Sequence, residues 1–174
     1  MEFDANLIPP ALGVLGLLIV FFIYQWIKKQ PGGSGSVQKI GEQIHIGSIV
    51  FMKREYKMLS IFALVLLVLL YIFLGPASAL CFLVGAVASA TAGYIGMNTA
   101  TIANVRTAQA AHTEGSAAAL TVAFFGGSVM GLSVAALGLL GLGGLYYFFG
   151  ETHSEALHGS VSYTHLTLPT NREV

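Results

Sequence analysis

Four long apolar stretches, separated by short polar segments, dominate the chain. No Asp, Glu, Lys or Arg lies between Lys57 and Arg106, and none lies between Glu114 and Glu151. A helix needs about 20 apolar residues to cross the hydrocarbon of a bilayer, so the first of these runs is too long for one crossing. We expect it to break at the sequence LGPAS, whose glycine and proline favour a turn. The pattern predicts an all-α membrane protein with crossings near residues 7–27, 58–75, 79–105 and 118–149.

The segment between the first two predicted crossings is polar and contains two distinct parts. QPGGSGS is typical of a flexible linker, and no Lys-Ser or Lys-Thr pair follows its last glycine as in a phosphate-binding loop. Residues 37–57 then place Val37, Ile40, Ile44 and Phe51 near one helical face, which predicts a short amphipathic helix at the membrane surface. We interpret the KREYK run at its end as the charged flank of the second crossing, in preference to a substrate-binding segment.

The distribution of basic residues predicts the topology, because Lys and Arg in short loops stay on the cytoplasmic side. The N-terminus should therefore lie outside, and the chain should return to the outside after the fourth crossing. The basic residues of the two loops that this places inside are Lys28, Lys29, Lys39, Lys53, Arg54, Lys57 and Arg106.

The last two apolar segments are longer than a crossing requires. Leu80 to Thr113 and Gly115 to Phe149 would each measure roughly 50 Å as helices, against about 30 Å of hydrocarbon. We expect both to extend into the cytoplasm as a hairpin that turns near Gly115. The polar side chains of its tip should then be solvated, which removes the cost of burying a cation in lipid; they are Arg106, Gln109, His112 and Glu114.

Small residues distinguish these two crossings from the second, which consists of bulky aliphatic and aromatic side chains and should face lipid at the edge of the bundle. Rows of Gly, Ala and Ser at four-residue spacing let helices approach closely where lipid provides no hydrophobic driving force. We favour packing over ligand contact as their role. The candidate packing residues are Gly85, Ser89, Gly93, Gly96, Gly127 and Gly131, and the residues expected at the cytoplasmic boundary are Asn104 and Arg106.

Composition supports a protein of the lipid bilayer. Hydrophobic residues make up 55% and charged residues 9% of the 174 residues, whereas a soluble domain carries about a quarter charged residues. The formal net charge of zero argues against a nucleic-acid partner, since such binding draws on a clustered basic surface. A single cysteine, Cys81, excludes a disulfide within the chain.

The sequence contains no recognisable active site. The predicted crossings hold no Asp or Glu, so the chain lacks an acidic proton or sodium relay of its own, which disfavours a rotor-ring subunit. HExxH and GxSxG motifs are missing. His153 and His158 with Glu151 and Glu155 could hold a metal, but we interpret them as part of a solvated outer loop. We predict no catalytic, cofactor-binding or metal-binding residue.

The ending VSYTHLTLPTNREV, residues 161–174, carries no membrane pattern. It resembles the translation of a sequencing-library adaptor more than a short C-terminal strand, and we exclude it from the fold. The natural part of this chain should then end near Gly159 or Ser160, where we expect the gene to have been cut, and residues 1–160 form one membrane unit.

Three motifs carry a family resemblance: GYIGM, ANVRT and AFFGGSVMG. With them, residues 1–159 closely resemble the N-terminal part of the membrane-bound pyrophosphatases, the pyrophosphate-energised proton or sodium pumps. Phe125 is a departure, because the family commonly has arginine there. The matching residues are Gly93, Gly96, Met97, Ala103, Asn104, Arg106, Thr107, Ala123, Phe124, Gly127, Val129, Met130 and Gly131.

The resemblance implies a homodimeric pump of about sixteen helices per subunit in a bacterial or archaeal plasma membrane. Such a pump hydrolyses pyrophosphate in the cytoplasm with Mg²⁺ and exports H⁺ or Na⁺, and the resemblance also allows K⁺ as a cofactor. The family's magnesium and pyrophosphate ligands lie on later helices, so no catalytic residue carries over and this fragment should be inactive. The alternative is a small non-enzymatic four-helix scaffold or assembly subunit of a membrane complex.

Overall fold

A computed structural model describes residues 7–33 and 35–149, and these residues form a bundle of long α-helices without strands. Each helix is long and apolar enough to cross a membrane, which confirms the all-α membrane architecture. The helices are α1 (Ile8–Lys29), α2 (Ser36–Leu74), α3 (Pro76–Thr113) and α4 (Ser116–Phe149).

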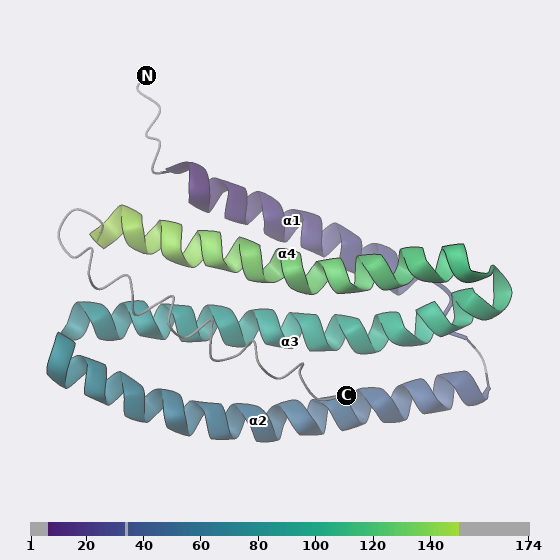
Figure 1. Ribbon diagram of the computed structural model, residues 1–174, viewed down its shortest axis with the longest axis horizontal. Helices are drawn as coiled ribbons and strands as arrows, with labels where there is room; N and C mark the ends of the chain where they lie inside the picture. Colours follow the sequence, from purple (N-terminus) through teal and green to yellow (C-terminus); the bar gives the residue numbers. More distant parts are fainter. Residues whose placement is uncertain (1–6, 34, 150–174) are drawn as a thin grey trace.

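In Figure 1 the helices follow one another in the order α1, α4, α3, α2, and the second half of α1 leaves the layer of the others, because it crosses α4 and contacts α3. The main contacts join α3 to α4, α1 to α4 and α2 to α3, and α1 makes a smaller contact with α3. Consecutive helices run antiparallel. The α1–α2 linker and the α3–α4 turn therefore lie at the same end of the bundle, and the α2–α3 turn lies at the other end.

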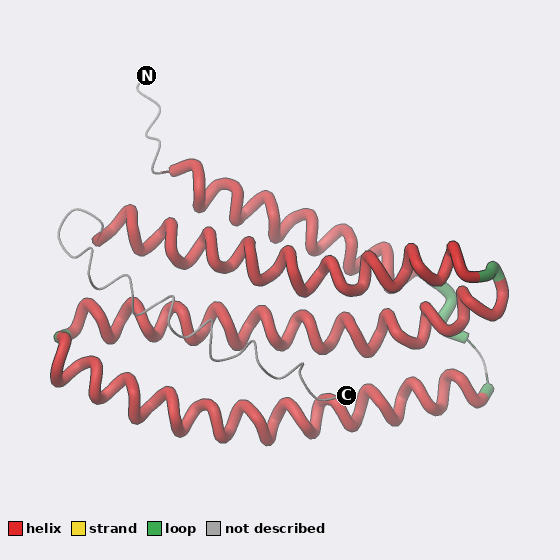
Figure 2. The backbone as a smooth tube through the Cα atoms, viewed as in Figure 1, coloured by secondary structure: helices red, strands yellow, loops and turns green. Residues whose placement is uncertain are grey.

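Both predicted breaks are confirmed, and the connections are short (Figure 2). Gly75 separates α2 from α3 with a φ of 90°, a left-handed conformation that glycine adopts without a steric cost, and Pro76 is the first residue of α3. Gly115, with a φ of 94°, ends α3 in the same way. The N–H groups of Glu114 and Gly115 both donate to the carbonyl of Ala110, at 2.9 and 3.1 Å, which satisfies the end of the helix.

The separate amphipathic helix expected over residues 37–57 is wrong. These residues form the first half of α2, which continues without a break for 39 residues. The reason is local, since no Gly or Pro lies between Gly47 and Gly75 to interrupt the backbone hydrogen bonds. The hydroxyl of Tyr56 donates to the carbonyl of Ala90 at 2.7 Å, which holds the middle of α2 against α3. The change in composition after Lys57 thus marks a change of surroundings within one helix.

The core follows the seam between α1, α3 and α4. Val20, Ile27, Ala103 and Val129 are buried together there, with partly buried side chains packed around them. In α2 the buried positions are Gly41 and Met52 alone among its described residues, which fits a helix at the edge of the bundle.

Candidate functional site

Arg106 links α3 to the end of α1. Its guanidinium donates from Nη1 to the carbonyl of Ile102 at 3.1 Å and from Nη2 to the carbonyl of Lys28 at 3.2 Å. The last carbonyls of a helix lack partners within that helix and carry partial negative charge. Arg106 therefore caps α1 from a neighbouring helix, at the end of the bundle that holds the α3–α4 turn.

Arg106, expected from the sequence to be solvated, is partly so. The side chain is half-buried, because the end of α1 covers this side of α3. Within the described residues, Nε of Arg106 and the hydroxyl of Thr107 are buried without a hydrogen-bond partner. Asn104, His112 and Glu114 are exposed, and Gln109 is half-buried.

Aromatic side chains of α1 reinforce the same junction. The amide of Asn98 donates to the hydroxyl of Tyr24 at 3.4 Å, and the ammonium of Lys28 lies 5.7 Å from the centre of the Tyr24 ring. Phe125 packs on Trp26, with ring centres 5.0 Å apart and an interplanar angle of 59°. The residue that departs from the family pattern thus forms an aromatic contact between α4 and α1.

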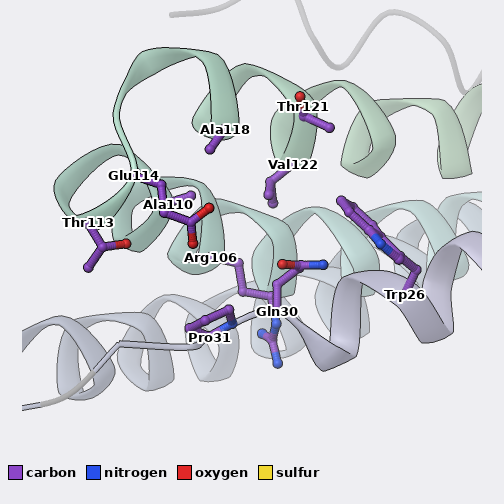
Figure 3. Close-up of a pocket in the computed structure, with 10 residues that line it drawn as sticks. All are labelled: Trp26, Gln30, Pro31, Arg106, Ala110, Thr113, Glu114, Ala118, Thr121 and Val122. Atoms are coloured by element: carbon purple, nitrogen blue, oxygen red, sulfur yellow. The ribbon is translucent and has the colours of Figure 1, made fainter.

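A pocket that is partly open to solvent lies beside Arg106 (Figure 3). Arg106 and Glu114 are the charged groups of its lining. The hydroxyls of Thr113 and Thr121 donate to carbonyls of their own helices, at 3.0 and 3.1 Å. The pocket is lined by Trp26, Gln30, Pro31, Arg106, Ala110, Thr113, Glu114, Ala118, Thr121 and Val122. Opposite charges on one wall do not favour an isolated anion such as pyrophosphate.

The candidate packing glycines of α3 lie at helix contacts. Gly85 and Gly96 are buried. A Cβ added at Gly96 would lie 2.6 Å from Cγ of Met130, so α4 approaches closely at this point. A Cβ added at Gly93 would lie 3.0 Å from the Tyr56 hydroxyl, and Ser89 is half-buried.

The candidates on α4 lie differently. Gly127 and Gly131 are exposed, and a Cβ added at either would meet no atom of the described chain within 4 Å. The preceding residue, Gly126, makes the close contact instead, since its Cβ would lie 2.5 Å from Cβ of Ala103. The packing role of Gly127 and Gly131 therefore stays a prediction.

The sequence-based candidates also missed the glycines between α1 and α4. A Cβ at Gly13 would lie 2.7 Å from the carbonyl oxygen of Ala136, and a Cβ at Gly143 would lie 2.9 Å from Cδ of Pro10. The sequence shows that α1 and α4 contain several glycines, but it does not show which of them face a neighbouring helix. That depends on how each helix is rotated about its own axis.

Known proteins match the part of the chain that contains the motifs of α3 and α4. A family model described as "Inorganic H+ pyrophosphatase" matches residues 14–166. That match ends inside residues 161–174, which lie outside the described residues together with His153 and His158.

Three relatives have names that state an activity. A Clostridium tetani protein, provisionally named a K⁺-stimulated pyrophosphate-energized sodium pump, is 48% identical over 139 residues, 79% of this chain and 20% of the relative. A K⁺-insensitive pyrophosphate-energized proton pump of Methanosarcina mazei is 40% identical over 144 residues, 82% of this chain and 21% of the relative. A K⁺-stimulated pyrophosphate-energized sodium pump of Thermotoga maritima is 44% identical over 126 residues, 72% of this chain and 17% of the relative.

The chain spans about a fifth of the length of the curated relatives that it matches. The family match nevertheless covers most of the chain, including α2, α3 and α4 in full and α1 from residue 14 onward. The chain therefore belongs to the inorganic H⁺ pyrophosphatase family.

Proposed function

We propose that the chain is the first part of a pump that hydrolyses pyrophosphate in the cytoplasm and exports H⁺ or Na⁺. The family match over residues 14–166 carries the proposal. The names of the relatives state this energy source, with sodium for the Clostridium tetani protein and a proton for that of Methanosarcina mazei. Because the chain spans a fifth of these proteins, the remaining helices of the pump should follow it in the natural sequence.

In this proposal, side chains of the later helices bind Mg²⁺. Metal-assisted attack of water on phosphorus requires carboxylates that converge on the metal. Within the described residues no group of three His, Cys, Asp or Glu side chains comes together, so these residues do not fit a magnesium site. The fragment alone should accordingly not hydrolyse pyrophosphate. K⁺ is a second cofactor if the pump follows the two relatives named K⁺-stimulated.

The four helices then act as a frame for the catalytic helices. Arg106 fastens α1 to the α3–α4 hairpin through Lys28, at the end that we assign to the cytoplasm, with the N-terminus outside. Gly127 and Gly131 form an exposed face of small residues on α4, and we propose that a later helix of the same protein packs against this face. A dimer of complete subunits follows from the same family proposal.

The gene itself provides the simplest test. The genomic reading frame is followed beyond Gly159, where we expect it to continue into apolar segments with clustered Asp and Lys residues. A stop codon at that point would favour the alternative, a small four-helix scaffold protein, and would overturn the pump assignment.

A further inference from the structure

Two clusters of cations lie at different heights in the bundle. The apolar run of α1 ends at Lys28 and Lys29, whereas the long apolar run of α2 begins only after Lys53, Arg54 and Lys57. In a membrane protein each cluster is expected to mark the boundary between hydrocarbon and water on its own helix. The two boundaries do not coincide.

Contacts of α1 and α2 with α3 give the distance between the two boundaries along the helix axis. The guanidinium of Arg106 donates hydrogen bonds to the carbonyls of both Lys28 and Ile102, so the end of α1 lies beside Ile102. Tyr56, one residue before Lys57, donates to the carbonyl of Ala90. Ile102 is the twelfth residue after Ala90 in α3, which corresponds to about 18 Å along the helix.

Both edges of the layer have surfaces that suit lipid. On α1, Leu18, Phe21 and Phe22 are exposed at heights between the two clusters of cations. On α2, the residues after Lys57 are bulky and exposed, as Leu64 and Ile72 show. Helices that pack against one another in membranes use small residues at the contact, and neither surface offers them.

A membrane surface perpendicular to the helices cannot satisfy both edges. If that surface lies at Lys28, the three cations of α2 lie roughly 13–20 Å inside the hydrocarbon, where exposed charges are costly. If it lies at Lys57, the aromatic surface of α1 around Phe22 projects into water.

We propose that the bilayer surface at this end crosses the bundle obliquely, from Lys28 and Lys29 on α1 to the cations at 53–57 on α2. Lipid chains then cover the exposed surface of α1. Because the end of α1 contacts α3 through Arg106, about two helix spacings, roughly 18 Å, separate it from α2, so a difference of about 18 Å corresponds to an inclination of roughly 45°. Transmembrane helices tilt by about 0–40°, and long lysine side chains reduce the angle that is needed.

Phe22 and Ile46 provide a matched pair for the test. Tyr24 contacts Asn98 and His45 contacts Thr101, so these neighbouring positions lie at nearly the same height on opposite edges of the layer. Phe22 is 68% exposed and Ile46 is 56% exposed. An oblique surface places residue 22 in hydrocarbon and residue 46 in water or headgroups, whereas a perpendicular surface places both in one environment.

The experiment uses single spin labels at Phe22→Cys and Ile46→Cys, with Cys81→Ala, in the whole chain in phosphatidylcholine vesicles. Oxygen collects in hydrocarbon and a nickel chelate in water, and Ile72→Cys serves as the hydrocarbon reference. We expect the ratio of oxygen to nickel accessibility to be several-fold higher at residue 22 than at residue 46, and close to that at residue 72. Equal ratios at 22 and 46 would overturn the proposal.

A second measurement checks that the labelled chains keep the bundle. In a chain labelled at both 22 and 46, pulsed electron paramagnetic resonance should give one narrow distribution of distances in lipid. A broad distribution would contradict the helix arrangement from which the oblique surface is inferred.

Discussion

Arg106 donates a hydrogen bond of 3.2 Å to the backbone carbonyl of Lys28, a residue 78 positions earlier in the chain. The contact joins α3 to the last turn of α1, whose main contact is with α4. Because a cation at the C-terminus of a helix is favourable, Arg106 fixes where α1 ends against the α3–α4 hairpin.

Replacing Arg106 with methionine should destabilise the isolated chain. The change keeps the length of the side chain but leaves the carbonyl of Lys28 without its donor. Hydrogen bonds from charged groups contribute about 1.5–3 kcal/mol, and we expect a loss of this size in the free energy of unfolding. Unfolding by sodium dodecyl sulfate in lipid–detergent bicelles, followed by circular dichroism, measures it.

Asn104→Ala is the matched control, because Asn104 lies on the same helix and is exposed. Its effect should stay within about 0.5 kcal/mol. Equal losses for the two variants would show that the link to α1 contributes nothing specific.

Gly126 and Gly127 are adjacent, yet they should respond in opposite ways to alanine. The added Cβ at residue 126 meets Cβ of Ala103 at 2.5 Å, and we expect a loss of about 1–3 kcal/mol from overpacking. At residue 127 it meets no described atom within 4 Å, and the higher helix propensity of alanine should leave stability unchanged or raise it by up to about 1 kcal/mol. The same unfolding experiment compares them, and a larger loss at residue 127 would refute the helix rotation described above.

The difference between these two glycines shows where the sequence stops being informative. The ends of the helices depend on local chemistry, and the turns at Gly75 and Gly115 are predictable for that reason. Which side of α4 faces α3 is decided by packing, because apolar and small residues surround this helix on every side. The sequence therefore indicates close contacts between α3 and α4 but not that Gly126 makes one and Gly127 does not.

The continuity of α2 was predictable in principle. No helix-breaking residue lies between Gly47 and Gly75, and that signal outweighs the change from amphipathic to apolar composition at Lys57. The capping of α1 by Arg106 was not predictable, because the length of a side chain and its neighbours in space decide whether a cation at a helix end is solvated.

Tyr56→Phe should weaken the contact between α2 and α3. The hydroxyl donates to the carbonyl of Ala90 at 2.7 Å, and polar contacts between membrane helices contribute about 0.6 kcal/mol on average, with a maximum near 1.7. Tyr71→Phe on the same helix is the control, since that ring is 61% exposed. Comparable losses from both variants in the free energy of unfolding would argue against the role assigned to Tyr56.

The proposed orientation is tested by labelling intact cells with a membrane-impermeant maleimide. In a Cys81→Ala background, Ser36→Cys at the start of α2 should be protected, because we place that end of the bundle in the cytoplasm. Ser154→Cys, which lies outside the described residues, should react. The reverse pattern would invert the topology.

If this chain begins a pyrophosphate-energised pump, the completed gene product must hydrolyse pyrophosphate. Membranes that carry the completed protein should release phosphate from pyrophosphate only with Mg²⁺, and vesicles made from them should build a gradient of H⁺ or Na⁺. Membranes that carry residues 1–160 alone should do neither. A completed protein that is present in the membrane and releases no phosphate above the background of empty membranes would contradict the assignment.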